Sequence, residues 1–183
     1  MTDRASTIGP SAEDFQHIKE KIVDYLSRQS FSEKKLLQKV TDLKRRYPRT
    51  KRYLFYTTEH VQRVINELKA VGLIDDRRYA EGVLRQLRDR KDGIHRMRQK
   101  MHHRLIPKQI IEDVLREWQS EGMKQDYTAI IRETKRKLER LREKYPSKKQ
   151  AYQIHQKLFT FLGQKGYAVD EVRRILSEVM PRT

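Results

Sequence analysis

Apolar residues recur at three- and four-residue intervals along most of this chain, which is the pattern of amphipathic helices. Polar and charged residues fill the positions between them, and short turn signals separate one apolar stripe from the next. The chain has only 7 glycines and 5 prolines, which leaves little material for a turn-rich β fold. The sequence therefore predicts an all-α protein.

The stretch 72–115 shows how these helices are expected to begin and end. Gly72 follows an apolar stripe and can adopt the left-handed conformation that ends a helix. Asp75 or Asp76 then caps the next helix, since a carboxylate is favoured at a helix N-terminus. Pro107 suits the first position of a later helix. We expect three helices joined by short turns here.

The apolar stripes also repeat along the chain as groups of three helices. The third helices of the groups superpose by pattern, and the residues that precede them match as Tyr56, Ile106 and Tyr167. We expect each group to have a long, a short and a medium helix, and to bury one face against its neighbour. The prediction is an all-α fold of three tandem three-helix repeats that form an elongated, curved helical array. Its expected parts are a disordered arm (1–11), repeat 1 (12–73) with a basic insertion (44–56), repeat 2 (74–122) and repeat 3 (126–181).

Charge narrows the class of partner. The sequence has 42 Lys and Arg against 25 Asp and Glu, which is a net charge of +17. Such a balance favours a polyanion or an acidic protein surface as partner. In the middle repeat, residues 85–104 hold eight basic side chains against two acidic ones. We expect these to form a binding surface, although a solvated helix face accounts for about half of them: Arg85, Arg88, Arg90, Lys91, Arg96, Arg98, Lys100 and Arg104.

The segment 44–56 is a second candidate surface. It contains six basic residues and no acidic one, namely Lys44, Arg45, Arg46, Arg49, Lys51 and Arg52. Aromatic residues interleave with them, and this combination suits a nucleic-acid backbone with occasional base stacking. The alternative is a solvated loop whose aromatic side chains pack on the neighbouring helices. The sequence leaves both interpretations open.

Features typical of enzymes, metal sites and membrane proteins are missing from the sequence. It has no cysteine, no glycine-rich phosphate loop and no nucleophile-elbow motif. No spacing of histidines suggests a third ligand beside His95 and His102. We therefore expect no enzyme activity, no metal and no cofactor. No apolar run approaches the length of a membrane span, and the first residues lack the apolar core of a signal peptide. The lack of cysteine fits a reducing cytoplasm.

Residues 72–115 resemble the central signature of the RecX family of recombination regulators. The resembling residues of the middle repeat are Gly72, Leu73, Ile74, Asp75, Asp76, Arg78, Tyr79, Ala80, Arg85, Gly93, Arg96, Ile106 and Pro107. Tyr25, Leu26, Arg28, Ser32, Leu36 and Lys39 resemble the family's pattern in the first repeat. The chain departs from the family at Lys100-Met101, where Glu-Leu is usual, and at Leu105, where a glycine is usual. Its insertion at 44–56 is longer than the usual tight turn.

The resemblance implies a regulator without enzymatic activity that acts on RecA. Members of the family are expected to bind along the RecA–DNA filament and to reduce ATP hydrolysis and strand exchange, with single- or double-stranded DNA as a second partner. The high net charge argues against tight self-association, so we expect a monomer. The alternative is a basic helical protein that binds DNA or RNA without regard to sequence. Sequence-specific reading is disfavoured, because the expected helix 107–119 is not basic and carries few side chains suited to base edges.

A first prediction concerns the inward face of the third helix of the middle repeat. Ile111→Asp places an unpaired charge in the expected core and should lower the free energy of unfolding by about 3 kcal/mol or more. The measurement is a urea unfolding curve followed by circular dichroism. A midpoint equal to that of the unmodified protein would show that Ile111 lies outside the core.

Overall fold

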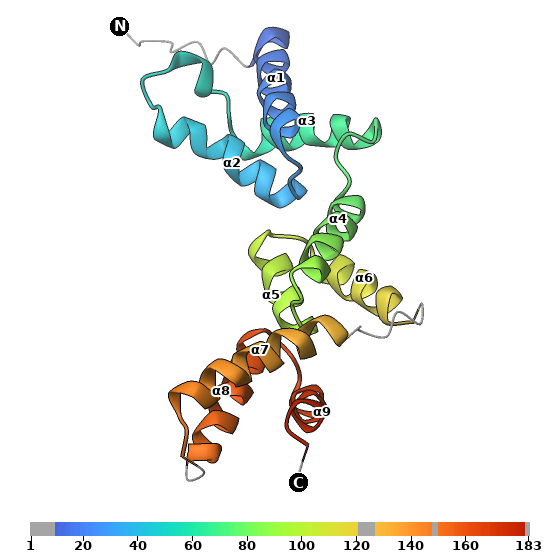
Figure 1. Ribbon diagram of the computed structural model, residues 1–183. Helices are drawn as coiled ribbons and strands as arrows, with labels where there is room; N and C mark the ends of the chain where they lie inside the picture. Colours follow the sequence, from blue (N-terminus) through green and yellow to red (C-terminus); the bar gives the residue numbers. More distant parts are fainter. Residues whose placement is uncertain (1–9, 121–126, 148–149, 182–183) are drawn as a thin grey trace, which may run out of the picture. The chain divides into compact units, whose positions relative to one another are not determined.

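The computed structural model describes residues 10–120, 127–147 and 150–181, and its described parts contain helices and turns but no strand (Figure 1). The prediction of an all-α protein is confirmed. The α-helices are α1 (Ala12–Arg28), α2 (Glu33–Arg46), α3 (Thr58–Ala70), α4 (Asp76–Asp89), α5 (Ile94–His103), α6 (Lys108–Ser120), α7 (Thr128–Lys144), α8 (Ala151–Gln164) and α9 (Val169–Val179), with a short 3₁₀ helix, η1 (Lys51–Tyr53). The expected arm falls mostly on residues 1–9, outside the described residues.

The helix starts follow the capping residues in the sequence. Ser11 and Asp14 form a reciprocal capping box at the start of α1. The Ser32 hydroxyl accepts a hydrogen bond from the first turn of α2, and the Thr57 hydroxyl does the same for α3. Each of these side chains satisfies a backbone N–H that has no partner inside its helix. Local sequence thus decides where the first three helices begin.

The chain divides into two compact units, Met1–Tyr79 with Arg104–Ile106 and Ala80–His103 with Pro107–Thr183. The core of the first unit lies among α1, α2 and α3. Ile18 and Ile22 of α1 meet Leu36 and Val40 of α2, while α3 contributes its apolar stripe. Burial of such side chains is the main favourable term in folding.

The start of α2 makes polar contacts with two turns that are distant in sequence. The buried Ser32 hydroxyl donates a hydrogen bond of 2.6 Å to the backbone carbonyl of Arg104. The Asp76 carboxylate accepts the backbone N–H of Glu33 at 2.7 Å, and burial raises the pKa of Asp76. Asp75 caps α4 itself by accepting from the N–H of Arg78. We call the contacts of Ser32 and Glu33 the first inter-repeat contact.

In the second unit, the start of α5 makes a corresponding contact with the turn between α8 and α9. The N–H of Gly93 donates to the carbonyl of Lys165 at 2.8 Å, and the N–H of His95 donates to that of Gly166 at 3.2 Å. The Tyr167 hydroxyl donates to the carbonyl of Lys91. We call this group the second inter-repeat contact. In both contacts, the start of a repeat's second helix meets the turn before the third helix of the following repeat.

The predicted correspondence among the third helices agrees with their burial. Tyr56, Ile106 and Tyr167, which precede α3, α6 and α9, are all buried. So are the residues aligned by pattern within these helices: Val61, Val64, Ile65, Ile111, Val114, Leu115, Val172, Ile175 and Leu176. The backbone adopts positive φ at Gly166 (87°) and at Leu105 (58°), one residue before two of these buried positions. The left-handed backbone explains why a glycine would suit position 105.

The expected order of long, short and medium helices is wrong for two of the three groups. It holds for α4, α5 and α6, with 14, 10 and 13 residues. In the first group α2 is not shorter than α3, and in the third group α9 is the shortest helix. The repeat boundaries at residues 73, 122 and 126 stay predictions, and the last two lie outside the described residues.

A second prediction tests the close backbone approach in the second inter-repeat contact. A Cβ atom at Gly93 would overlap the carbonyl group of Gly166, which is backbone and has little room to move. Gly93→Ala should therefore lower the free energy of unfolding by about 3 kcal/mol. The measurement is a chemical unfolding curve.

Gly163→Ala provides the matched control for this prediction. Its Cβ would meet no atom within 4 Å, and Gly163 lies in the last turn of α8. Alanine there should raise the free energy of unfolding by about 0.5–1 kcal/mol. Equal effects of the two substitutions would contradict the close approach at Gly93.

Candidate partner-binding surface

The basic side chains of segment 44–56 lie on the surface of the first unit. Lys44, Arg49, Lys51 and Arg52 are exposed, and none of them forms an ion pair with another residue in the described parts of the chain. Arg45 and Arg46 contact Asp42 of their own helix at 3.3 and 3.7 Å. Such exposed pairs contribute little to stability. The segment therefore presents a cluster of cations to solvent.

Some aromatic residues of this segment pack on the neighbouring helices, and one remains exposed for contact with a partner. Tyr56 is buried, and its hydroxyl lies 2.9 Å from Nδ1 of His17 on α1. Burial raises its pKa. The Tyr53 ring lies 5.0 Å from that of Tyr56, and it is partly buried. These two rings anchor the segment on α1, whereas Tyr47 remains 53% exposed. Packing accounts for Tyr53 and Tyr56, and leaves Tyr47 accessible to a partner.

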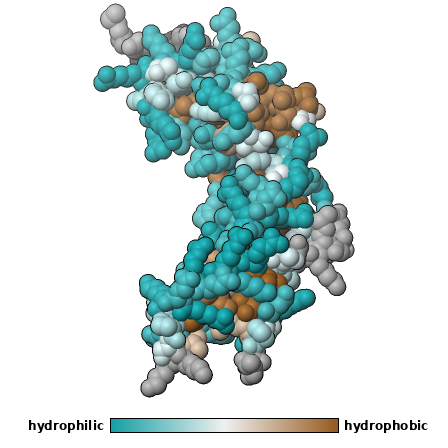
Figure 2. Space-filling model, viewed as in Figure 1, coloured by the Kyte–Doolittle hydropathy of each residue, from teal (hydrophilic) through white to brown (hydrophobic). Residues whose placement is uncertain are grey.

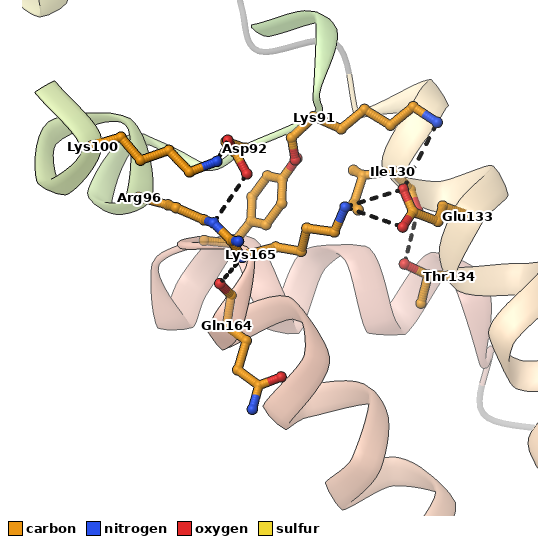
Figure 3. Close-up of polar contacts among 10 residues, drawn as sticks. Lys91, Asp92, Arg96, Lys100, Ile130, Glu133, Thr134, Gln164 and Lys165 are labelled. Atoms are coloured by element: carbon orange, nitrogen blue, oxygen red, sulfur yellow. Dashed lines mark hydrogen bonds and ion pairs between the residues drawn. The ribbon is translucent and has the colours of Figure 1, made fainter. Parts of the chain in front are cut away.

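Three of the predicted cations in the middle repeat take part in contacts near the second inter-repeat contact (Figure 3). Arg96 and Lys100 both pair with Asp92, whose carboxylate is only 4% exposed. Arg96 also donates a 2.6 Å hydrogen bond to the backbone carbonyl of Gln164. Lys91 approaches Glu133 at 3.8 Å, and Lys165 pairs with the same carboxylate at 3.1 Å. These charges compensate buried and half-buried carboxylates before any partner is present.

Arg98 is also engaged within the protein. Its guanidinium makes two hydrogen bonds, of 2.8 and 3.0 Å, to the carboxylate of Glu112 on α6. This bidentate geometry holds the pKa of Glu112 below its usual value and raises that of Arg98. The pair joins α5 to α6, so Arg98 has a structural contact that spacing along the sequence did not reveal.

The remaining middle-repeat candidates are more available. Arg85, Arg88 and Arg90 are exposed on α4 and just beyond its end, and Arg85 and Arg90 form no ion pair with another described residue. The guanidinium of Arg88 lies 5.7 Å from the centre of the Trp118 ring. Arg104 is half-buried and contributes its carbonyl to the first inter-repeat contact. The geometry thus favours α4 as the accessible part of this surface.

A further basic surface lies on α7, outside the two segments that the sequence analysis names as candidate surfaces. The outer face of α7 carries exposed cations that form no ion pair within the described residues, namely Arg132, Lys135, Arg136, Arg140 and Arg142. Over the whole helix, seven basic residues face three acidic ones, which is +4. The density of positive charge along this helix is the feature of the sequence that points to this surface.

The described residues were also compared with the requirements of metal sites and membrane spans. The face drawn in Figure 2 is mostly hydrophilic, with small apolar areas among the polar side chains. Among the described residues, no cluster of histidine and carboxylate side chains has the arrangement of a metal site. Within the same parts of the chain, no helix combines the length and the apolar character that crossing a membrane requires.

Comparison with known proteins identifies relatives over most of this chain. No protein-family model matches it. A "Regulatory protein RecX" from Finegoldia magna is 29% identical over 154 residues, which cover 84% of this chain and 67% of that protein. Proteins of the same name from Clostridium perfringens and Streptococcus mutans are 33% and 28% identical over 63% and 67% of this chain. The chain spans 51% and 44% of those two proteins, so it covers about half to two thirds of the relatives' length.

Solved structures match the same fold. The crystal structure of RecX from Lactobacillus salivarius superposes with a TM-score of 0.66 and covers 92% of this chain and 98% of its own, at 22% identity. A second RecX crystal structure gives a TM-score of 0.65 over 91% of this chain and 73% of its own, at 21% identity. Fold and charge thus define an all-α protein of tandem helical repeats with an accessible basic surface. The chain is similar in sequence and in fold to the regulatory proteins named RecX.

A third prediction separates structural cations from accessible ones. Arg96→Glu with Lys100→Glu would place two carboxylates beside buried Asp92, and should lower the free energy of unfolding by about 3 kcal/mol. Arg85→Glu with Arg90→Glu changes the charge equally on the exposed surface, and should alter that free energy by about 0.5 kcal/mol or less. Urea unfolding curves of both variants test this. Equal destabilisation by the two pairs of substitutions would contradict the distinction between structural and accessible cations.

Proposed function

We propose that this protein binds the RecA–DNA filament and reduces the ATP hydrolysis and strand exchange that RecA carries out. The observation that carries the proposal is the match to regulatory RecX proteins along most of the chain, in both sequence and fold. In this proposal the protein acts by binding, without catalysis, as a monomer in the cytoplasm. RecA and DNA are its partners.

The distribution of charge supports a filament as the partner. A net charge of +17 steers the protein towards phosphates and acidic side chains. The accessible cations Arg85, Arg88 and Arg90, together with those of segment 44–56, are the groups that we propose to contact the filament. The cations paired with Asp92, Glu112 and Glu133 support the shape of the binding surface instead.

A second candidate function is sequence-independent binding of DNA or RNA, which the net charge alone favours. Reading of base sequence finds little support. Helix α6 carries Glu112 and Asp113 on its surface, and both are engaged with basic or amide side chains of the protein. The two functions differ in their need for RecA. A filament regulator requires RecA on the DNA, whereas a simple electrostatic binder does not.

A fourth prediction follows from this difference. The single-strand-dependent ATP hydrolysis of RecA should be inhibited at well below one molecule of this protein per RecA, at physiological salt. The inhibition should be insensitive to a doubling of the DNA concentration, because the filament rather than free phosphate is the target. Arg85→Glu with Arg90→Glu should raise the concentration needed for half-inhibition about tenfold or more, which corresponds to losing contacts of roughly 1.4 kcal/mol.

The control for this assay is Lys19→Glu with Lys34→Glu, which makes the same change of charge at exposed positions of α1 and α2. This control should inhibit almost as well as the unmodified protein. Inhibition that appears only at excess protein and is relieved by more DNA would favour the general nucleic-acid binder. An absence of inhibition at both DNA concentrations would contradict the proposed function.

A further inference from the structure

A groove of about 460 Å³ lies between α7 and α8 in the second unit. Its apolar floor is formed by Leu141 and Phe161, and its rim carries Lys137, Lys157, Gln156 and Gln164. The volume lies in the range that accommodates a small organic group. The lining combines one aromatic ring, positive charge and amide groups that donate and accept hydrogen bonds.

Lysines flank the aromatic rings along this groove. The ammonium groups of Lys137 and Lys165 lie 4.7 and 5.7 Å from the centre of the Phe161 ring. The Tyr145 ring is flanked in the same way by Lys144 and Lys157, at 5.8 and 5.5 Å. Tyr152, at the start of α8, is 69% exposed and accepts a hydrogen bond from Gln156. Phe161 and Tyr145 therefore each have two lysine ammonium groups beside the ring.

The outer face of α7, the helix that forms one wall of the groove, also carries cations. Arg132, Arg136 and Arg140 recur every four residues, so they lie on one side of the helix about 6 Å apart along its axis. All three are exposed and form no ion pair within the described parts of the chain. The same helix thus carries evenly spaced cations that can contact a chain of phosphates, and two residues, Lys137 and Leu141, that line the groove.

We infer that the α7–α8 groove is a binding site for single-stranded nucleic acid. Phosphates lie along the arginines of α7 and the lysines of the rim, and an unpaired base stacks on Phe161. The amides of Gln156 and Gln164 are adaptable partners for a base edge, which makes the site tolerant of sequence. A duplex has the same phosphates but keeps its bases stacked inside, so it cannot use the apolar floor.

The site is distinct from the candidate surfaces of the middle repeat and segment 44–56, and the inference does not depend on RecA. The test therefore uses only the protein and labelled oligonucleotides. Fluorescence anisotropy measures binding of an oligothymidylate, an oligouridylate and a DNA duplex of equal length over a series of salt concentrations. We expect the single strands to bind more tightly than the duplex, and the two single strands identify whether DNA or RNA is preferred. Duplex binding as tight as single-strand binding would overturn the inference.

Two variants separate stacking from charge. Phe161→Leu keeps an apolar side chain and the net charge, and should weaken single-strand binding roughly fivefold or more without changing the salt dependence. Lys137→Gln with Lys157→Gln should reduce the slope of log K against log salt by about 1.4, since each lysine releases a fraction of a counterion. Unchanged affinity of the Phe161 variant would overturn the stacking site.

The matched control is Lys19→Gln with Arg173→Gln, which removes the same charge at exposed positions on α1 and α9. It should change the slope much less than the lysine pair does, and an equal change would overturn the location of the site. A measurement without substitutions in the groove completes the test. A single strand that carries 5-iodouracil should photocrosslink to peptides that contain Tyr145, Tyr152 or Phe161. Crosslinks confined to segment 44–56 would contradict the inference.

Discussion

The polar contacts between successive repeats are the constraint on which this structure depends. In each, the start of a second helix meets the turn that precedes the third helix of the following repeat. The first uses the buried Ser32 hydroxyl and the carbonyl of Arg104. The second uses the backbone around Gly93 and Gly166. A side chain on Gly93 would overlap the backbone carbonyl of Gly166. Such contacts are directional, and buried polar groups left without partners are costly, so they hold these backbone segments together within each unit.

This constraint divides the basic residues into two kinds. Arg96 and Lys100 compensate the buried carboxylate of Asp92 beside the second inter-repeat contact, and Arg98 is held by Glu112. Their positive charge contributes to the integrity of the fold as well as to the field around the protein. Other cations form no ion pair with a carboxylate among the described residues. They are Arg85, Arg90 and most of the basic residues of segment 44–56 and of α7. A partner can therefore contact them without disturbing the repeats.

Much of the fold could be predicted because its signals are local. The caps at Ser11, Ser32 and Thr57 and the left-handed turn at Gly72 follow from the preferences of these residue types. The individual roles of charged residues could not be predicted. Asp76 caps a helix that begins 43 residues before it, and Arg96 reaches a carbonyl 68 residues away. Spacing along one helix tells which side chains share a face, and says nothing about which distant group that face will meet.

We propose that the accessible cations of α4 and of segment 44–56 are directed at a RecA–DNA filament rather than at nucleic acid alone. Since the sequence has no cysteine, Lys19→Cys at an exposed position of α1 gives a single site for a fluorescent label. The anisotropy of the labelled protein would be measured at about 0.15 M salt with RecA–single-strand filaments and with the same single strand alone. We predict clearly tighter binding to the filament. Equal affinity for the filament and for the bare strand would contradict the claim.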